Sequence, residues 1–383
     1  MKDKIVYIIT VILSIIYIVV GNKIASENLT IFDQNAQQNV KKAVVTKIVD
    51  KVNTAEDIQI EGMETFENWS ITFEAEITNG EEKGQVVSAY QNINSMMPSD
   101  LKEVEVGDKV IILEETLDDA IAEWTLLEYN RSDALVVLGI IFLVIIILFG
   151  RIKGFNTILS LVFTVLSIFI VFIPAILSGK NIYIWSIVTC VFITVMTLLI
   201  VNGANKKSLA AGIGCLGGVV VAGILTVIMD NIIKLTGYVD ENSVYLVYLN
   251  EQNPIDLKAI IFSSIIIGAI GAIMDVAVDI SVALKEIADK VKDANFHSIV
   301  KSGFTIGRDI LGTMSTTLIL AYIGSSLSIV LLLVAYNSSL TYLFNREMIV
   351  VEILQALVGS LGILFTIPLT SIICAILYTR NRD

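Results

Sequence analysis

Four charged side chains stand inside long apolar runs in the second half of the sequence. Asp275 and Asp279 interrupt the run GAIGAIMDVAVDISVAL, and Arg308 and Asp309 open the next one. The i, i+4 spacing of the two aspartates places both carboxylates on one face of a helix. Consecutive helices joined by a short loop run antiparallel. We therefore expect all four side chains to lie at about the same level.

Such charges are unfavourable in a lipid bilayer, because each one near the middle of a crossing helix costs about 2.5–3.5 kcal/mol. We expect them to be paired, to line a water-filled cavity or to be partly protonated. The planar guanidinium of Arg308 can bridge two carboxylates, and Asp275 or Asp279 is its expected partner. One carboxylate then remains in excess and could hold a proton or a cation. Two interpretations stay open: a coupling site for ion or proton movement, and an ion-pair network that fixes helix packing.

Hydroxyl, amide and carboxyl side chains continue this polar pattern along the predicted helices. Candidates for a polar path are Thr313, Ser315, Thr316, Thr317, Glu352 and Gln355. The alternative is structural, because Ser and Thr in membrane helices often bond to their own backbone or link neighbouring helices.

Several other chemistries are excluded by residue type. His297 is the one histidine of the chain, so a His-rich metal site or a Ser-His-Asp triad cannot form within one polypeptide. No glycine run is followed by the Lys-Ser/Thr of a nucleotide-binding loop. The Gly-x-Gly-Asp motif of intramembrane aspartyl proteases is also missing. We therefore predict no enzymatic activity, no catalytic residue, no metal and no cofactor.

The elements that position these residues are predicted to be membrane helices. Of the 383 residues, 55% are hydrophobic and 17% are charged, and a water-soluble domain of this size rarely reaches such an apolar fraction. A helix needs about 20 apolar residues to cross a bilayer. Eight segments qualify as crossings: Ile5–Val20, Ala134–Phe149, Ile158–Leu177, Ile182–Val201, Leu209–Ile233, Ala259–Leu284, Ile310–Tyr336 and Ile349–Tyr378.

Basic residues between these segments predict their direction, because short cytoplasmic loops are enriched in Lys and Arg. The basic positions at 2–4, 151–153, 206–207, 285–301 and 380–382 all fall on one side when the spans alternate. We therefore expect a multi-pass plasma-membrane protein with both termini in the cytoplasm. Glycines at helical spacing, such as Gly218, Gly271 and Gly362, predict close helix packing.

A different pattern occupies residues 24–131, which carry 22 acidic and 8 basic side chains. This acidic surface argues against nucleic acid as a partner. The segment contains short runs rich in β-branched and aromatic residues, with turn signals at Asn79-Gly80 and Gly107-Asp108. We predict strands at Val40–Val49, Trp69–Ile77, Gly84–Tyr90, Lys109–Leu113 and Trp124–Tyr129.

The predicted fold class is thus an α-helical multi-pass membrane bundle of about eight helices with one small extracytoplasmic all-β domain. We expect this domain to be a barrel of the oligomer-binding type. The predicted domains are an N-terminal membrane anchor at 1–23, the extracytoplasmic β domain at 24–131, and a seven-helix transmembrane domain at 132–383.

Three sequence stretches resemble one known family. They are GAIGAIMDVAVDIS, SGFTIGRDILGTMSTTLILAYIGSS, and E-x-x-x-A-L-V-G-S-L-G with a later I-P-L-T. Together they resemble the YibE/F-like bacterial membrane proteins, and Arg-x-Lys-Gly at 151–154 and the Gly-Asp turn between strands extend the likeness over nearly the whole chain. The resemblance implies a multi-pass bacterial membrane protein and adds no chemistry.

Two functions fit these observations. The first is a secondary transporter or permease, in which Asp275, Asp279, Arg308 and Asp309 form the coupling site for a small ion or small-molecule substrate. The second is a non-transporting scaffold or sensor, in which the exterior domain binds a ligand or an envelope protein. A homo-oligomer is compatible with either function.

Overall fold

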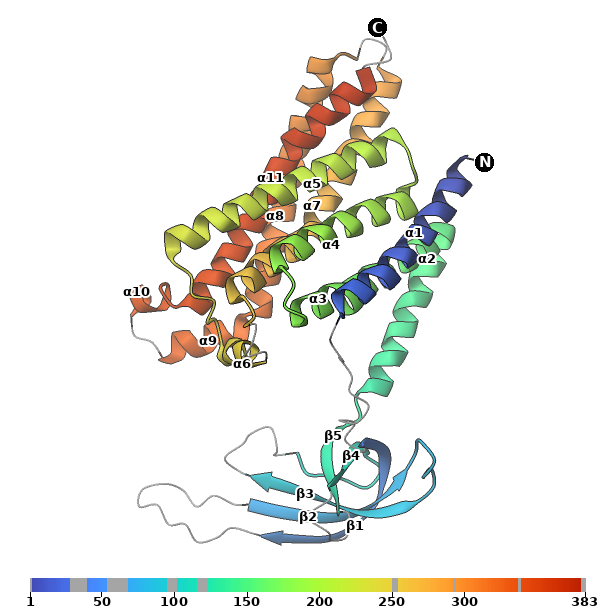
Figure 1. The fold of residues 1–383 in the computed structure, drawn as a ribbon, viewed down its shortest axis with the longest axis vertical. Coiled ribbons are helices and arrows are strands. Elements are labelled where there is room, and N and C mark those ends of the chain that lie inside the picture. Colours follow the sequence, from blue (N-terminus) through green and yellow to red (C-terminus); the bar gives the residue numbers. More distant parts are fainter. Residues whose placement is uncertain are drawn as a thin grey trace. The chain divides into compact units, whose positions relative to one another are not determined.

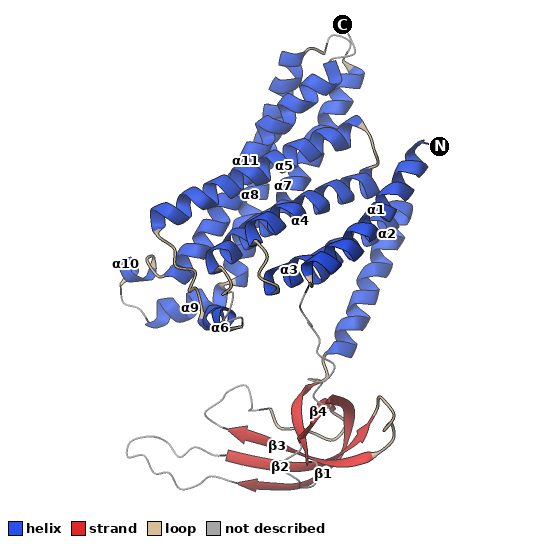
Figure 2. Cartoon of the chain, viewed as in Figure 1, coloured by secondary structure: helices blue, strands red, loops and turns tan. Residues whose placement is uncertain are grey.

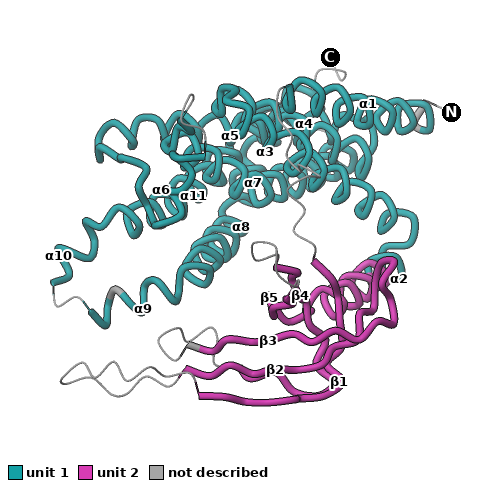
Figure 3. The backbone as a smooth tube through the Cα atoms, turned by 60° about the horizontal axis from the view of Figure 1, so that its bottom comes forward, with its two compact units in different colours: residues 1–31, 146–383 teal, residues 32–145 magenta. Residues whose placement is uncertain are grey.

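Two compact units make up the chain in a computed structural model (Figure 3). One unit contains residues 1–31 and 146–383, and the other contains residues 32–145. The structure describes residues 2–27, 40–53, 68–94, 102–115, 123–249, 254–291, 294–336 and 339–379. Arg380 and Arg382, which support the predicted orientation, lie outside the described residues.

The unit of residues 32–145 is built on a closed five-stranded barrel, drawn in red in Figure 2. Neighbouring strands follow the order β1-β2-β3-β5-β4, and β4 pairs back to β1. All pairs are antiparallel except that of β3 with β5. The predicted barrel is therefore confirmed, and its strand count and closure fit the oligomer-binding type. The strands are β1 (Val40–Asn53), β2 (Asn68–Ile77), β3 (Val86–Asn94), β4 (Lys109–Glu115) and β5 (Glu123–Tyr129).

Alternation along β2 creates the barrel core, because successive side chains of a strand point to opposite faces. Ile71, Phe73, Ala75 and Ile77 are all buried, as their spacing predicts. The Asn79-Gly80 signal lies in the connection between the antiparallel strands β2 and β3, but this connection is longer than a two-residue turn and spans residues 78–85. The Asn79 side chain accepts a hydrogen bond from the Lys42 backbone N–H at 2.7 Å and so ties this connection to β1.

The other unit is helical (Figure 1), and six of the described helices are long and apolar enough to cross a membrane, or seven if one bent pair counts as one span. They include the predicted segments, but the two predicted spans Ala134–Phe149 and Ile158–Leu177 lie in one continuous stretch, Ser132–Leu177, so the described helices do not reach the predicted count of eight. The first half contains α1 (Lys2–Ala25), α2 (Ser132–Leu166), η3 (Ser167–Phe172), α3 (Ile173–Leu177), α4 (Ile182–Thr197), η4 (Leu198–Asn202) and α5 (Lys206–Ile233). The second half contains α6 (Glu241–Tyr248), α7 (Leu257–Lys290), α8 (Phe296–Ser325), α9 (Leu327–Tyr336), α10 (Leu340–Leu343) and α11 (Glu347–Thr379).

One predicted span is wrong in detail. The sequence suggests a single helix over Ile310–Tyr336, whereas α8 begins at Phe296, ends at Ser325 and is followed by α9 at an angle of 65°. Asn295 caps the N-terminus of α8 by accepting from the Ser298 backbone N–H at 2.9 Å, which satisfies an otherwise free donor. Arg308 and Asp309 consequently lie midway along α8 and not at the start of a helix.

The core of the helical unit is formed by α5, α7, α8 and α11, and in it α11 packs against the other three (Figure 1). Glycines allow this close approach. A Cβ built on Gly218 of α5 would lie 2.9 Å from the Gly362 carbonyl oxygen of α11. The fully buried Ile273, Ile280 and Ile363 fill the space between these helices. The predicted close packing is confirmed at Gly218 and Gly362.

Candidate functional site

Helix α7 is buried on most sides but leaves one stripe exposed. It packs against α4, α5, α8 and α11. The exposed positions recur every three or four residues and so follow one face of the helix. They include Ser264, Gly268, Gly271, Asp275 and Asp279. Both aspartates therefore lie on the same open face of α7, as their spacing predicts.

Two contacts fix how α8 lies alongside α7. A Cβ built on Gly303 of α8 would lie 3.1 Å from Leu284 Cδ1 of α7, and one built on Gly268 of α7 would lie 2.7 Å from the Tyr322 hydroxyl oxygen of α8. The helices are therefore antiparallel. This register places Asp279 level with Arg308.

Arg308 lies at the edge of the α7-facing side of α8. Arg308, Ser315 and Tyr322 are seven residues apart, and seven residues are close to two full helical turns. Arg308 therefore lies about 40° from Tyr322, which faces Gly268 of α7, but about 140° from Gly303, which also contacts α7. Asp275 and Asp279 thus lie on an exposed face of α7, with Arg308 exposed on α8 at about the same level. All three are exposed, and no ion pair among the described residues joins Arg308 to either aspartate.

Asp309 and most of the hydroxyl residues lie elsewhere on α8. Asp309 is turned about 140° from Tyr322 around the helix axis, so it points away from α7. Thr313, Thr316 and Thr317 lie on that same far side. Their hydroxyl groups donate to the backbone oxygens of Ile310, Gly312 and Thr313 at 2.7–2.9 Å. Among the predicted path residues on α8, Ser315 is the one that lies on the side facing α7.

A second polar group lies farther along α7, where α11 approaches. Gln355 Nε2 donates to Ser264 Oγ at 2.7 Å and so links α11 to α7. Glu352 Oε2 and the Tyr322 hydroxyl oxygen are buried and have no hydrogen-bond partner among the described residues. Both line a cavity of about 220 Å³ between α8, α9 and α11.

Buried polar atoms without partners are rare in folded proteins. Glu352 and Tyr322 therefore mark a place where water or an ion would be stabilised. Sequence reasoning proposed Glu352 and Gln355 but missed Ser264, whose only signal is the Ser263-Ser264 pair in an apolar run. Within the described ranges, no group of three or more His, Cys, Asp or Glu residues could hold a metal ion.

Comparison with protein families gives one match, to the YibE/F-like protein family over residues 138–380. The match includes α7, α8 and α11 and begins after the barrel, so the expected likeness of the barrel is not part of it. Compared with curated proteins and with solved structures, the chain gives no match. Because the matched region covers more than half of the sequence and contains every charged residue of the candidate site, the chain belongs to the YibE/F-like family.

Proposed function

We propose that the chain crosses the plasma membrane eight times, with both termini in the cytoplasm. The continuous helical stretch Ser132–Leu177 has 46 residues, which corresponds to about 69 Å, more than twice the hydrocarbon thickness of about 30 Å. Its backbone breaks at Arg151, with φ 49° and ψ −124°. A Cβ on Gly154 would lie 3.3 Å from Ile147 Cα, so the chain folds back there. Dividing this stretch in two and counting α8 with α9 as one span gives eight crossings.

We further propose that the protein is a secondary transporter or permease without enzymatic activity. The observation that carries this proposal is the presence of Asp275 and Asp279 on α7 at about the level of Arg308 on the neighbouring α8, inside two apolar helices. Ionisable groups at such positions are unfavourable unless they serve a pathway or a partner. The exposed carboxylates can take up a proton or a small cation, and Arg308 can replace that cation by moving toward them.

The break between α8 and α9 supports the same function. Discontinuous helices are a recurring feature of transporter binding sites, because the ends of half-helices offer free backbone groups to ions. Tyr322 and Glu352 lie beside this break, in the 220 Å³ cavity. We propose that Glu352, Gln355 and Tyr322 form the outer part of the path, and that Asp275, Asp279 and Arg308 form its inner part.

Charge movement in liposomes tests this proposal. Purified full-length protein is reconstituted, and currents are recorded after jumps in proton, sodium or potassium concentration. We expect currents from the wild type and their loss in Asp279→Asn and Arg308→Ala. Asp309→Asn is the matched control, because Asp309 lies next to Arg308 but points away from α7, and we expect it to retain the current. Wild-type currents from Asp279→Asn, with equal amounts of protein, would refute the proposal.

The alternative function is a scaffold or sensor that acts through the barrel. It is favoured by one observation: the barrel has its own core around Phe73, Val110 and Ile112 and lies outside the family match. Replacing residues 32–131 by a flexible linker separates the two functions. A permease would keep its current, whereas a sensor would lose its cellular phenotype while the four charged residues could be neutralised without effect.

A further inference from the structure

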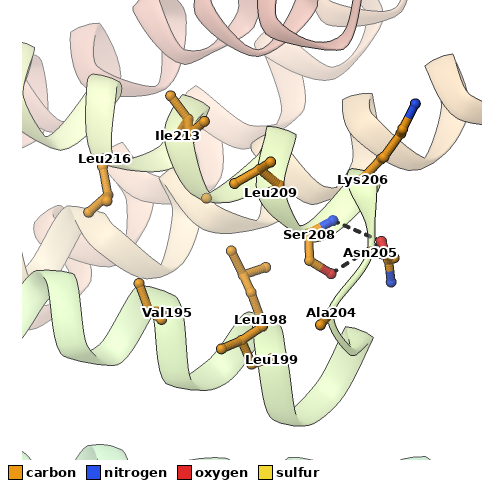
Figure 4. Close-up of a pocket in the computed structure, with 11 residues that line it drawn as sticks. Val195, Leu198, Leu199, Ala204, Asn205, Lys206, Ser208, Leu209, Ile213 and Leu216 are labelled. Carbon is orange, nitrogen blue, oxygen red and sulfur yellow. Dashed lines mark hydrogen bonds between the residues drawn. The ribbon is translucent and has the colours of Figure 1, made fainter. Parts of the chain in front are cut away.

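An apolar groove separates α4 from α5 on the outside of the helical unit. The two helices are consecutive and joined by residues 203–205, yet both rest on α7. Between them lies a cavity of about 670 Å³ (Figure 4). Its walls include Leu198 and Leu199 from the α4 side and Leu209, Ile213 and Leu216 from α5. A second cavity of about 600 Å³ continues from Leu216 toward Ile228.

The length of the first groove matches one leaflet of a bilayer. Its lining on α5 runs from Asn205 to Leu216, which is about 17 Å at the rise of an α-helix. Half of a hydrocarbon core is about 15 Å. The second cavity continues along α5 from Leu216 to Ile228 for a similar distance, so the two cavities together are about as long as the hydrocarbon core of a bilayer.

Polar groups at the end of the groove near residues 203–208 already have hydrogen-bond partners. Ser208 Oγ donates to the Gly203 carbonyl oxygen at 2.5 Å, and Asn205 Nδ2 donates to the Asn202 carbonyl oxygen at 2.7 Å. The remaining walls are aliphatic. Such a surface suits a hydrocarbon chain and offers a polar ligand nothing to bind.

Positive charge gathers at the end where α5 begins. Lys206 lies at the end of the groove, with its ammonium group directed away from the aliphatic walls (Figure 4). Its Nζ donates to the Leu377 carbonyl oxygen at 3.0 Å, and an ammonium group has two further protons to donate. Lys153 and Lys207 line a neighbouring cavity of about 210 Å³ that adjoins the groove at Ser208. Basic clusters at the cytoplasmic ends of membrane helices attract anionic headgroups.

We propose that the groove between α4 and α5 binds an acyl chain of an anionic phospholipid from the inner leaflet, with the headgroup at Lys206. The proposal rests on the membrane orientation given above and is independent of transport. It assigns a ligand to Lys206, in addition to the predicted role of this lysine in orientation. Loss of the current in the liposome experiment would not argue against this lipid-binding proposal.

Native mass spectrometry of the detergent-purified full chain tests lipid binding. Phosphatidylglycerol is compared with phosphatidylcholine of identical chains. We expect phosphatidylglycerol to bind the wild type about fivefold more tightly, equivalent to about 1 kcal/mol for one lysine beside an anionic lipid. Lys206→Gln should remove this preference. Equal binding of the two lipids by the wild type would overturn the proposal.

Filling the groove with a larger side chain tests whether the acyl chain of the lipid lies in it. Gly212 lines the groove, and Gly212→Leu should weaken the binding of both lipids at least tenfold. Leu209→Trp is a second filling variant, in case Gly212→Leu unfolds. Gly139→Leu is the matched control, because a Cβ at Gly139 meets nothing within 4 Å, and its binding should equal that of the wild type. Wild-type binding by both filling variants, or displacement of the lipid by free glycerol phosphate, would overturn the proposal.

Discussion

Single carboxylates fix the connections between the helices, and Glu347 is the clearest case. Its Oε1 accepts from the backbone N–H groups of Thr236 and Gly237 at 2.7 and 2.5 Å, and its Oε2 accepts from the Thr236 hydroxyl at 2.6 Å. The first turn of α11 thereby holds the turn that follows α5. Gly237 adopts φ +93°, a conformation that glycine tolerates without strain.

Removing this carboxylate should destabilise the helical unit. Glu347→Ala leaves two backbone donors without their acceptor, and we expect a loss of about 1–3 kcal/mol. Glu347→Gln keeps one acceptor oxygen and should lose less. Thermal unfolding in detergent measures both. Identical midpoints for Glu347→Ala and wild type would show that water replaces the carboxylate without penalty.

Asp240 should make the short helix α6 sensitive to acid. Its Oδ1 accepts from the Ser243 hydroxyl at 2.6 Å and from the Ser243 backbone N–H at 2.8 Å. These hydrogen bonds hold the pKa of Asp240 below its ordinary value of 3.8. A lowered pKa stabilises the fold above the ordinary value, and this contribution is lost as the pH falls through the folded-state pKa.

Hydrogen exchange of the α6 amides measures this effect. Protection in the wild type should be constant at neutral pH and should fall once the pH drops below about 3.8, the ordinary pKa of Asp240. Asp240→Asn keeps the cap but cannot titrate, so its protection should not change over this range. The same acid dependence in Asp240→Asn would assign the effect to another group.

Residue spacing along the sequence predicted the pair of aspartates on α7 but not the separation of Arg308 from Asp309. Adjacent residues of a helix point about 100° apart, so at most one of them can face a given neighbour. Which one does so depends on the rotation of α8, and that rotation is fixed by Gly303 and Tyr322 through contacts with residues distant in sequence. Local pattern contains no such information.

At the scale of the elements, glycine positions decide how closely the helices approach. Gly218 and Gly271 are both helical glycines, but a Cβ on Gly218 would meet the Gly362 carbonyl oxygen, whereas one on Gly271 meets nothing within 4 Å. The sequence predicted close packing at both, and the prediction is wrong for Gly271. Spacing alone does not tell which face of a helix has a neighbour.

Alanine at these two positions should have opposite effects. Gly218→Ala overfills the contact with α11 and should cost about 1–3 kcal/mol. Gly271→Ala should be neutral or stabilise by about 0.5–1 kcal/mol, because alanine favours a helix interior over glycine. Unfolding midpoints in detergent compare the two. A loss in Gly271→Ala equal to that in Gly218→Ala would contradict this account of the packing.

The strands and the helices α1, α5 and α11 were predicted from the sequence to within about five residues, because alternation and apolar length are local properties. Neither the start of α8 at Phe296 nor the break between α8 and α9 was predicted. The residues at 324–326 are Gly-Ser-Ser within an apolar run, and the Ser326 backbone N–H still donates to the Tyr322 oxygen at 3.1 Å. The apolar character of the sequence therefore continues through the point where the backbone changes direction.

At the scale of the whole molecule, α8 carries a polar stripe that no described part of the chain covers. Thr305, Asp309, Thr313 and Thr316 are exposed on the side away from α7. In a bilayer, exposure of an ionised Asp309 to lipid would cost about 2.5–3.5 kcal/mol. We expect a second copy of the chain to cover this stripe.

Cysteine cross-linking in native membranes tests this association. Thr313→Cys should give a covalent dimer on mild oxidation. Leu357→Cys on α11, which is also exposed, should not. The native cysteines at 190, 215 and 374 are buried, so they add no background. A monomer for Thr313→Cys, or equal dimer yields from both variants, would argue against a second copy at this face.

The backbone break at Arg151 has a consequence for everything that follows it. In a chain that crosses a membrane repeatedly, adding or removing one reversal moves every later loop to the opposite side of the membrane. In the proposed topology, the turn at Arg151 places the lysines after α4 and after α7 on the cytoplasmic side, where basic residues are retained. Without it, the same residues would have to be translocated. In the proposed topology, the backbone reversal at Arg151 thus sets the sidedness of about 230 residues that follow it.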